Sequence, residues 1–135
     1  MDAVPPELTV RDALRWAARL LSTSDSETPR LDAELLLAHV LGVERAQLPA
    51  RWRQTLGDAA ARDFTALVRR RVAHEPVAYL LGRRDFYDLT LQVDGRVLIP
   101  RPESEHLVEA VLRWAAPERA WRVADVGTGS GALAV

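Results

Sequence analysis

A glycine-rich turn near the end of the 135-residue chain is the feature that most constrains the fold. The apolar run Trp121–Val126 leads directly into Gly127–Gly131, which reads Gly-Thr-Gly-Ser-Gly. Glycine permits a tight turn and a close approach of the backbone to a neighbouring group. A short apolar run before such a turn is typical of a buried strand, so we predict a strand at Trp121–Val126 and a helix that begins at Ala132–Val135. The pattern indicates the start of an α/β domain.

The front of the chain carries a different pattern, with apolar side chains at the spacing of amphipathic helices. Thr9 suits the cap of a first helix, and Thr28-Pro29 suits the start of a second helix that Gly42 would end. Two further helices are predicted at Asp58–His74 and Val77–Leu81. Because these apolar stripes can cover one another, the front part is predicted to be a helical bundle.

After Leu81 the pattern changes to one typical of β-strands. A strand is predicted at Phe86–Val93, with a hairpin turn at Asp94-Gly95 and a return strand at Val97–Ile99. From Glu103 a helix resumes, with its apolar residues on one side: Leu107, Val108, Val111 and Leu112. The predicted parts are a helical domain at residues 1–82, a β-hairpin linker at 83–102 and the start of an α/β domain at 103–135.

Composition excludes several classes of protein. Hydrophobic residues make up 48% and charged residues 27% of the chain, which is typical of a soluble globular protein. The net charge of −1 gives no general attraction to nucleic acid, so no direct nucleic-acid partner is expected. No apolar run is long enough to span a membrane, and no signal peptide is recognisable. Cysteine is absent, and His39, His74 and His106 lack ligand spacing, so no metal site is expected. We expect a cytoplasmic monomer.

The glycine turn is also a candidate ligand-binding loop. The N-terminus of the helix predicted after it would offer free N–H groups and a partial positive charge to an anionic group. The spacing from Gly127 to Ala132 fits the G-x-G-x-x-A pattern of dinucleotide-binding proteins. With Asp125 the segment also reads Asp-x-Gly-x-Gly-x-Gly, which resembles the first motif of S-adenosylmethionine-dependent methyltransferases. Since the glycine spacing fits both classes, the loop alone favours the methyltransferase without excluding a nicotinamide-dependent enzyme.

A second segment, Ile99–Glu105, precedes the loop by one predicted helix and reads Ile-Pro-Arg-Pro-Glu-Ser-Glu. It resembles the I-P-R-P-[DE]-[ST]-E segment of the peptide-chain-release-factor glutamine N5-methyltransferases, and Arg84–Tyr87 resembles their R-x-F-[WYF] segment. Arg30–Leu37 and Glu75–Gly82 are similar to the R-x-D-A-E-x-L-L and E-P-x-x-Y-[LI]-x-G runs of the same family. Pro102 favours the release-factor branch over the related enzymes that modify a ribosomal protein. The resemblance covers nearly the whole chain.

This resemblance implies a function and a fold. The family transfers a methyl group from S-adenosylmethionine to the side-chain amide N5 of the glutamine in the Gly-Gly-Gln motif of class I peptide chain release factors, which act in translation termination. A helical N-terminal domain for recognition of the substrate would precede a doubly wound, Rossmann-like α/β methyltransferase domain. The residues expected to bind the cofactor are Pro100, Arg101, Glu105, Asp125, Gly127, Thr128, Gly129, Ser130 and Gly131.

One departure from the family concerns catalysis. The family's catalytic signature is Asn-Pro-Pro-Tyr, which holds the substrate amide, whereas this sequence contains no Asn. The acidic residue expected on the second strand for the cofactor ribose is also missing. No catalytic residue is therefore assigned, and we expect the chain to be an incomplete and inactive front part of such an enzyme. A non-catalytic helical module that binds a partner and a fragment of a nicotinamide-dependent oxidoreductase are the alternatives.

Overall fold

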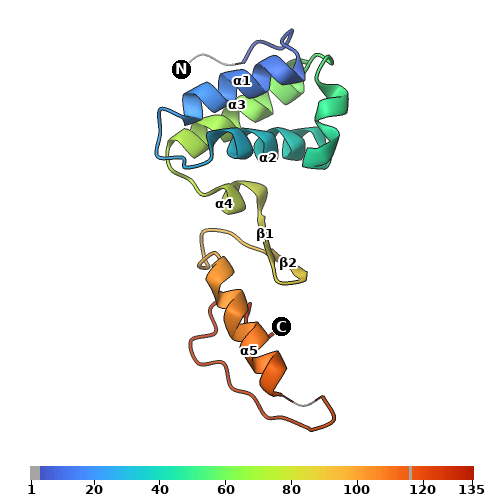
Figure 1. Ribbon diagram of the computed structural model, residues 1–135. Coiled ribbons are helices and arrows are strands. Elements are labelled where there is room, and N and C mark those ends of the chain that lie inside the picture. The colour runs from blue at the N-terminus through green and yellow to red at the C-terminus, as the bar shows by residue number, and fades with distance from the viewer. Residues whose placement is uncertain (1–3, 116) are drawn as a thin grey trace. The chain divides into compact units, whose positions relative to one another are not determined.

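The computed structural model describes residues 4–115 and 117–135, and the chain divides after Leu81 into two compact units. The first, here called the helical unit, contains α1 (Val10–Leu21), α2 (Pro29–Leu41), η1 (Arg45–Gln47), η2 (Pro49–Arg51), α3 (Asp58–Val72) and α4 (Val77–Leu81). The second, the C-terminal unit, begins at Gly82 and contains β1 (Arg83–Phe86), β2 (Leu89–Gln92), η3 (Pro102–Ser104) and α5 (Glu105–Trp114). A helical region is thus followed by a two-stranded antiparallel sheet (Figure 1).

The ends of α1 and α2 follow local capping chemistry. The hydroxyl of Thr9 accepts a hydrogen bond from the Asp12 N–H at 3.2 Å and thereby satisfies one of the free donors at the start of α1. Gly42 ends α2 with a left-handed φ of 62°, as predicted. Thr28 lies at the N-cap position of α2, but its side chain caps no N–H group and donates to Asp32 Oδ1 at 3.2 Å.

Helix α3 ends at Val72 and not at the predicted His74. His74 adopts a left-handed φ of 68°, which the helical pattern of the sequence does not indicate. Beyond it, the Glu75 carboxylate accepts two hydrogen bonds from the Arg70 guanidinium, at 2.7 and 2.6 Å. These bonds hold the pKa of Glu75 below its ordinary value. The chain therefore folds back on the last turn of α3 before Pro76, where continued helical geometry is disfavoured.

The apolar faces of α1, α2 and α3 meet in one core, and Figure 1 shows α2 crossing alongside the other two helices. The Phe64 side chain is fully buried at its centre, with its ring centroid 6.2 Å from that of Trp16. Burying a side chain of the size of leucine or phenylalanine stabilises a fold by ~1.5–3 kcal/mol. The fully or nearly fully buried core side chains on these helices are Val10, Ala13, Ala17, Leu21, Ala33, Leu36, Leu37, Ala38, Ala61, Phe64 and Val68.

The segment before α1 also belongs to this core. Val4 is buried, and its N–H donates to the Thr65 hydroxyl of α3 at 3.0 Å. The same hydroxyl donates to the Ala61 carbonyl at 2.7 Å, so both hydrogen-bonding functions of this buried group are used. Further along, the Leu56 N–H donates to the Leu8 carbonyl at 3.1 Å. The N-terminal segment is therefore tied to α3 and to the loop that precedes it.

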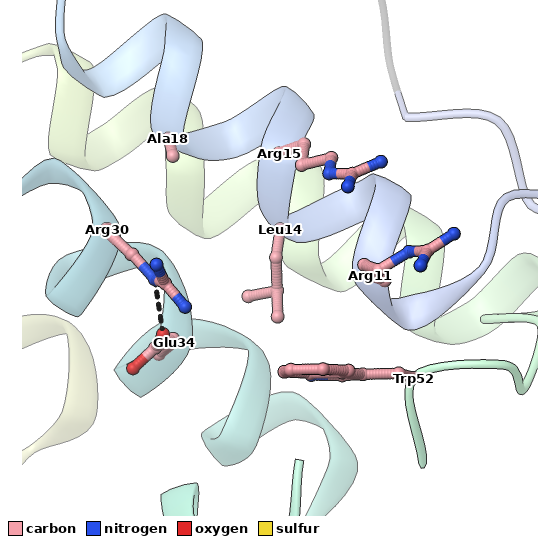
Figure 2. A pocket seen from close by; sticks show the side chains of 7 residues that line it. All are labelled: Arg11, Leu14, Arg15, Ala18, Arg30, Glu34 and Trp52. Atoms are coloured by element: carbon pink, nitrogen blue, oxygen red, sulfur yellow. Dashed lines mark hydrogen bonds and ion pairs between the residues drawn. The ribbon is translucent and has the colours of Figure 1, made fainter. Parts of the chain in front are cut away.

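A groove of about 340 Å³ remains open on the helical unit between α1, α2 and the turn after η2 (Figure 2). Leu14 and Ala18 of α1 and the ring of Trp52 give it apolar walls, while Arg30 and Glu34 line it from α2. Trp52 is 40% exposed although its backbone carbonyl accepts a hydrogen bond from the Arg11 N–H at 3.3 Å.

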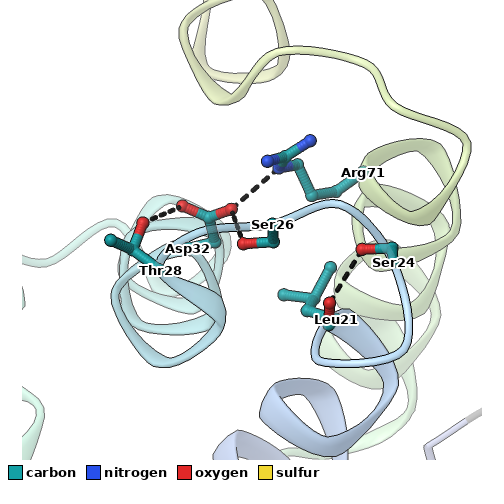
Figure 3. A network of polar contacts seen from close by, with 6 residues as sticks. All are labelled: Leu21, Ser24, Ser26, Thr28, Asp32 and Arg71. Atoms are coloured by element: carbon teal, nitrogen blue, oxygen red, sulfur yellow. Dashed lines mark hydrogen bonds and ion pairs between the residues drawn. The ribbon is translucent and has the colours of Figure 1, made fainter.

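A buried ion pair joins α2 to α3 on another side of the helical unit (Figure 3). Asp32 Oδ2 lies 2.8 Å from Arg71 Nε and also accepts from the Ser26 hydroxyl at 2.8 Å. The side chains of Asp32 and Arg71 are only 8% and 17% exposed. Because the carboxylate has three hydrogen-bond donors, including the Thr28 hydroxyl, its desolvation is compensated. The pair fixes the start of α2 against the end of α3.

The hairpin of the C-terminal unit differs from the prediction in its register. β1 and β2 pair antiparallel, with Arg83 opposite Gln92 and Phe86 opposite Leu89. The connection is therefore the two residues after Phe86, and Tyr87 adopts the left-handed φ of 55° that a tight hairpin turn requires. Asp94-Gly95 forms a turn, but the predicted return strand Val97–Ile99 is absent from the structure.

The last part of the chain lacks the predicted strand and helix. Residues 121–126 carry no ladder hydrogen bonds, and Ala132–Val135 forms only turns. A parallel strand needs neighbouring strands to satisfy its N–H and C=O groups, and the described residues of this unit contain only the β1–β2 hairpin. The apolar residues predicted to share one side of α5 are likewise not buried, and Leu112 is 58% exposed. The antiparallel hairpin is thus the only sheet within the described part of the chain, which otherwise contains an isolated antiparallel bridge between Thr9 and Thr55.

Candidate functional site

The glycine loop is open at each of its glycines. Gly127, Gly129 and Gly131 have backbone φ values of 78°, 56° and 81°, which residues other than glycine rarely adopt. A Cβ added at Gly127 would meet no atom within 4 Å, and at Gly129 it would meet only the Gly127 carbonyl at 4.0 Å. The Gly131 N–H donates to the Thr128 carbonyl at 2.9 Å and closes a turn around Ser130. The backbone is therefore accessible to a ligand that lies against the loop.

Asp125 precedes this loop and holds an enclosed acceptor. Its side chain is half-buried, and its Oδ2 atom is shielded from solvent without a hydrogen-bond partner among the described residues. Buried polar atoms without a partner are uncommon and often mark a place where another group binds. An open glycine backbone beside such an acceptor fits a ligand that brings a hydroxyl or amino donor, which suits the amino-acid end and ribose of S-adenosylmethionine. The helix N-terminus predicted after Gly131 is not formed, so it adds no donors here.

The Pro100–Glu105 segment has a structural role of its own. Arg101 precedes η3, and its carbonyl accepts from the Ser104 N–H at 3.0 Å. Glu105, at the start of α5, accepts a hydrogen bond at Oε1 from the Tyr87 N–H at 2.8 Å. Tyr87 is the left-handed turn residue of the hairpin, so Glu105 holds the β1–β2 turn against the start of α5. Within the described residues, no hydrogen bond or ion pair joins Arg101 to the glycine loop.

Arg84 is a residue for which sequence reasoning gave a motif but no role. It lies on β1, and its Nε atom is enclosed without a hydrogen-bond partner among the described residues. The other enclosed side-chain atom of this kind in the C-terminal unit is Asp125 Oδ2. One is a donor and the other an acceptor, and both belong to segments that resemble methyltransferase motifs. Position in the R-x-F-[WYF] segment was the signal that could have found Arg84.

The described residues offer neither a metal site nor a membrane-spanning helix. In the part of the chain that the structure describes, no group of three or more histidine and carboxylate side chains could hold a metal ion. Across the same residues, no helix has both the length and the apolar character that crossing a bilayer requires.

The family comparison identifies the helical unit. The sequence model of the PrmC N-terminal domain matches residues 12–82, more than half of the chain. The chain belongs to the PrmC N-terminal domain family. The match begins within α1 and runs past the end of α4, so it includes the Asp32–Arg71 ion pair and every residue that lines the groove at Trp52 except Arg11.

Curated relatives of this PrmC-type chain extend the likeness into the C-terminal unit. A protein of Coxiella burnetii named release factor glutamine methyltransferase is 45% identical over 128 residues, which cover 95% of this chain and 46% of the relative. Proteins of the same name from Rhodopirellula baltica and Neisseria gonorrhoeae are 44% and 48% identical, over 94% and 82% of this chain. They are covered over 44% and 40% of their own length. The chain thus spans a little under half the length of these relatives.

The family run R-x-D-A-E has structural duties in this chain. Arg30 Nε donates to Glu34 Oε1 at 3.0 Å, one turn further along α2. Asp32, between them in sequence, pairs with Arg71 of α3 (Figure 3). One run therefore supplies the carboxylate of the α2–α3 ion pair and two of the side chains that line the groove.

Proposed function

We propose that the protein to which this chain belongs transfers a methyl group from S-adenosylmethionine to the side-chain amide N5 of the glutamine in the Gly-Gly-Gln motif of class I release factors. Membership of the PrmC N-terminal domain family carries the proposal, together with relatives named release factor glutamine methyltransferase that are 39–48% identical. The open glycine loop beside the free Asp125 acceptor supports it. The setting would be translation termination in the cytoplasm, with the protein acting as a monomer.

In this proposal residues of this chain bind the cofactor, and the glycines of the loop leave room for it. When bound, S-adenosylmethionine supplies an electrophilic methyl group on its sulfonium. The backbone of Gly127, Gly129 and Gly131 leaves room for the ligand, with Thr128 and Ser130 presenting hydroxyls from the same loop. Asp125 Oδ2 accepts a hydrogen bond from a ligand donor. Pro100 and Arg101 border the cofactor, while Glu105 positions the hairpin turn.

The proposal also assigns domains. Residues 1–82 form the substrate-recognition domain, 83–102 the β-hairpin linker and 103–135 the start of a doubly wound methyltransferase domain. In the complete domain, Trp121–Val126 would pair as a strand with its neighbours, and the apolar side of α5 would be covered by the sheet. This chain contains no Asn, so it does not itself supply the family's Asn-Pro-Pro-Tyr signature for orienting the substrate amide.

The test is methyl transfer to a release factor, measured by mass analysis of its Gly-Gly-Gln peptide. The full-length protein should add one methyl group to that glutamine, whereas the 135-residue chain should add none. Orientation of reacting groups contributes roughly 7–11 kcal/mol to such a reaction, so loss of the orienting residues should abolish turnover. Failure of the full-length protein to modify the glutamine would refute the proposed function.

A variant separates the cofactor site from the rest. In the full-length protein, Gly129→Val should abolish S-adenosylmethionine binding measured by calorimetry, since a branched side chain resists the φ of 56° and fills the space beside the loop. Ala134→Val, at an exposed position after the loop, is the matched control and should bind normally. Unchanged affinity of Gly129→Val with an intact fold would mean that the loop is only a turn.

A further inference from the structure

We infer that the groove at Trp52 on the helical unit binds an acidic peptide segment of the protein substrate, with one apolar side chain of that segment held against Leu14 and Trp52. The inference rests on the proposed function for the identity of the partner, and on the geometry of the groove for its chemistry. At about 340 Å³ the groove has the size of a small ligand pocket, enough for one or two side chains.

The walls of the groove provide the apolar part of the site. Figure 2 shows Leu14 pointing from α1 toward the flat ring of Trp52, with Ala18 one turn further along the same helix. The backbone of Trp52 is fixed, because its carbonyl accepts from the Arg11 N–H at 3.3 Å and its backbone N–H donates to the Pro49 carbonyl at 3.4 Å. A 40% exposed tryptophan on such a backbone is the kind of residue that carries binding energy when a partner covers it.

The charges around the groove favour a negatively charged partner. Arg11, Arg15 and Arg30 line it together with a single carboxylate, Glu34. That carboxylate is already engaged, since Arg30 Nε lies 3.0 Å and Arg45 Nη1 3.9 Å from its two oxygens. Arg15 makes only an exposed contact of 3.5 Å with Asp12, and Arg11 has no ion-pair partner among the described residues. Guanidinium groups are therefore available to carboxylates of a bound segment.

A peptide fits this arrangement better than a nucleic acid. A single tryptophan offers one stacking surface, whereas single-stranded nucleic acids are held by several aromatic platforms along a basic track. The chain as a whole has a net charge of −1, which gives no general attraction to nucleic acid.

Titration of the ¹⁵N-labelled 135-residue chain with short synthetic peptides tests the inference without any methyl transfer. The probe peptide carries one leucine flanked by glutamates, and its controls replace the glutamates by lysines or the leucine by serine. The indole signals of Trp16, Trp52, Trp114 and Trp121 are assigned from Trp→Phe variants. The acidic peptide should shift the Trp52 signal, bind more weakly as salt is raised, and lose affinity when the leucine is replaced.

Variants locate the binding charges. The double substitution Arg11→Glu and Arg15→Glu should weaken binding of the acidic peptide about tenfold or more, with the helical CD signal unchanged. Arg62→Glu, at an exposed position of α3 that does not line the groove, should bind like the parent chain. Equal binding of the lysine peptide, an unmoved Trp52 signal, or preference for a uridine oligonucleotide would overturn the inference. Absence of methylation by the full-length protein would instead count against the proposed function alone.

Discussion

The helical unit and the C-terminal unit are built from similar sequence material but differ in what their apolar side chains contact. In α1, α2 and α3 the apolar stripes meet one another, and Phe64 is fully buried. In the C-terminal unit α5 carries an apolar stripe of the same kind, yet its Leu112 side chain is 58% exposed. Val126, in the segment before the glycine loop, is 96% exposed. Helical periodicity therefore indicates which face can be buried, whereas burial itself depends on a covering partner. An α/β unit obtains that partner from strands that are distant in sequence.

The largest expected difference between the two units is in amide hydrogen exchange. Amides of Leu36 and Phe64 should exchange only through unfolding of the helical unit, which corresponds to about 5 kcal/mol or more for a stable small domain. Amides of Ala124 and Val126 should exchange almost as fast as in an unfolded chain, because no ladder hydrogen bonds protect them. Strong protection of Val123–Val126 in the 135-residue chain would show that the second unit is ordered without further strands.

The second largest difference is expected from substitutions in the apolar stripes of α3 and α5. Phe64→Ala should destabilise the helical unit by about 3–5 kcal/mol, since it removes a fully buried ring and leaves a cavity among α1, α2 and α3. Leu112→Ala on α5 is the control and should change stability by less than about 0.5 kcal/mol. Urea unfolding followed by far-UV CD measures both. Equal effects of the two variants would remove the contrast between the units.

The Asp32–Arg71 ion pair offers a test of the polar contacts that hold the helical unit. Asp32→Ala should cost about 3 kcal/mol, because Arg71 Nε would lose its carboxylate while remaining mostly buried. Asp25, whose side chain is 91% exposed and lies 3.4 Å from His74, provides the comparison. Asp25→Ala should change stability by less than about 0.5 kcal/mol. A loss for Asp32→Ala as small as that for Asp25→Ala would mean that the network contributes no net stability.

The smallest effect is expected at an exposed turn of the C-terminal unit. Hydrogen bonds from the Arg96 guanidinium and N–H lower the pKa of Asp94 to about 2. A depressed carboxyl pKa means that the contact is present at neutral pH and is lost as pH falls through about 2. Arg96→Gln should return the pKa of Asp94 toward the ordinary value of about 3.9, as measured by NMR titration of the carboxyl carbon. An unshifted pKa in the parent chain would contradict the turn geometry.

Local signals in the sequence predicted the helical unit well. The starts of α1 and α2 and the glycine end of α2 depend on residues within a few positions of each other, and these helices were confirmed. The end of α3 was misplaced because His74 takes a left-handed φ that histidine does not signal. The hairpin register was wrong for the same reason, since Tyr87 and not Asp94-Gly95 makes the tight turn.

Non-local requirements account for what the sequence could not predict. A strand at Trp121–Val126 depends on neighbours that the described part of the unit does not supply, whatever its own β propensity. At the candidate site, motif resemblance pointed to Glu105, but only the fold revealed that its carboxylate accepts from the Tyr87 N–H. The cofactor-binding roles of Pro100 and Arg101 stay predictions. The sequence did not predict the groove at Trp52, because its lining residues come from three separate segments.

The contact between Val4 and Thr65 has a practical consequence for dissecting this protein. The family match begins at Asp12, and a fragment trimmed to that boundary would lose both Thr9, the cap of α1, and the buried Val4 side chain. The vacated space beside Thr65 would remain in the middle of α3, at a cost of ~1.5–3 kcal/mol for the valine alone. Expression boundaries drawn from sequence homology would therefore cut through the hydrophobic interior, and a purification tag is better attached through a spacer ahead of Val4.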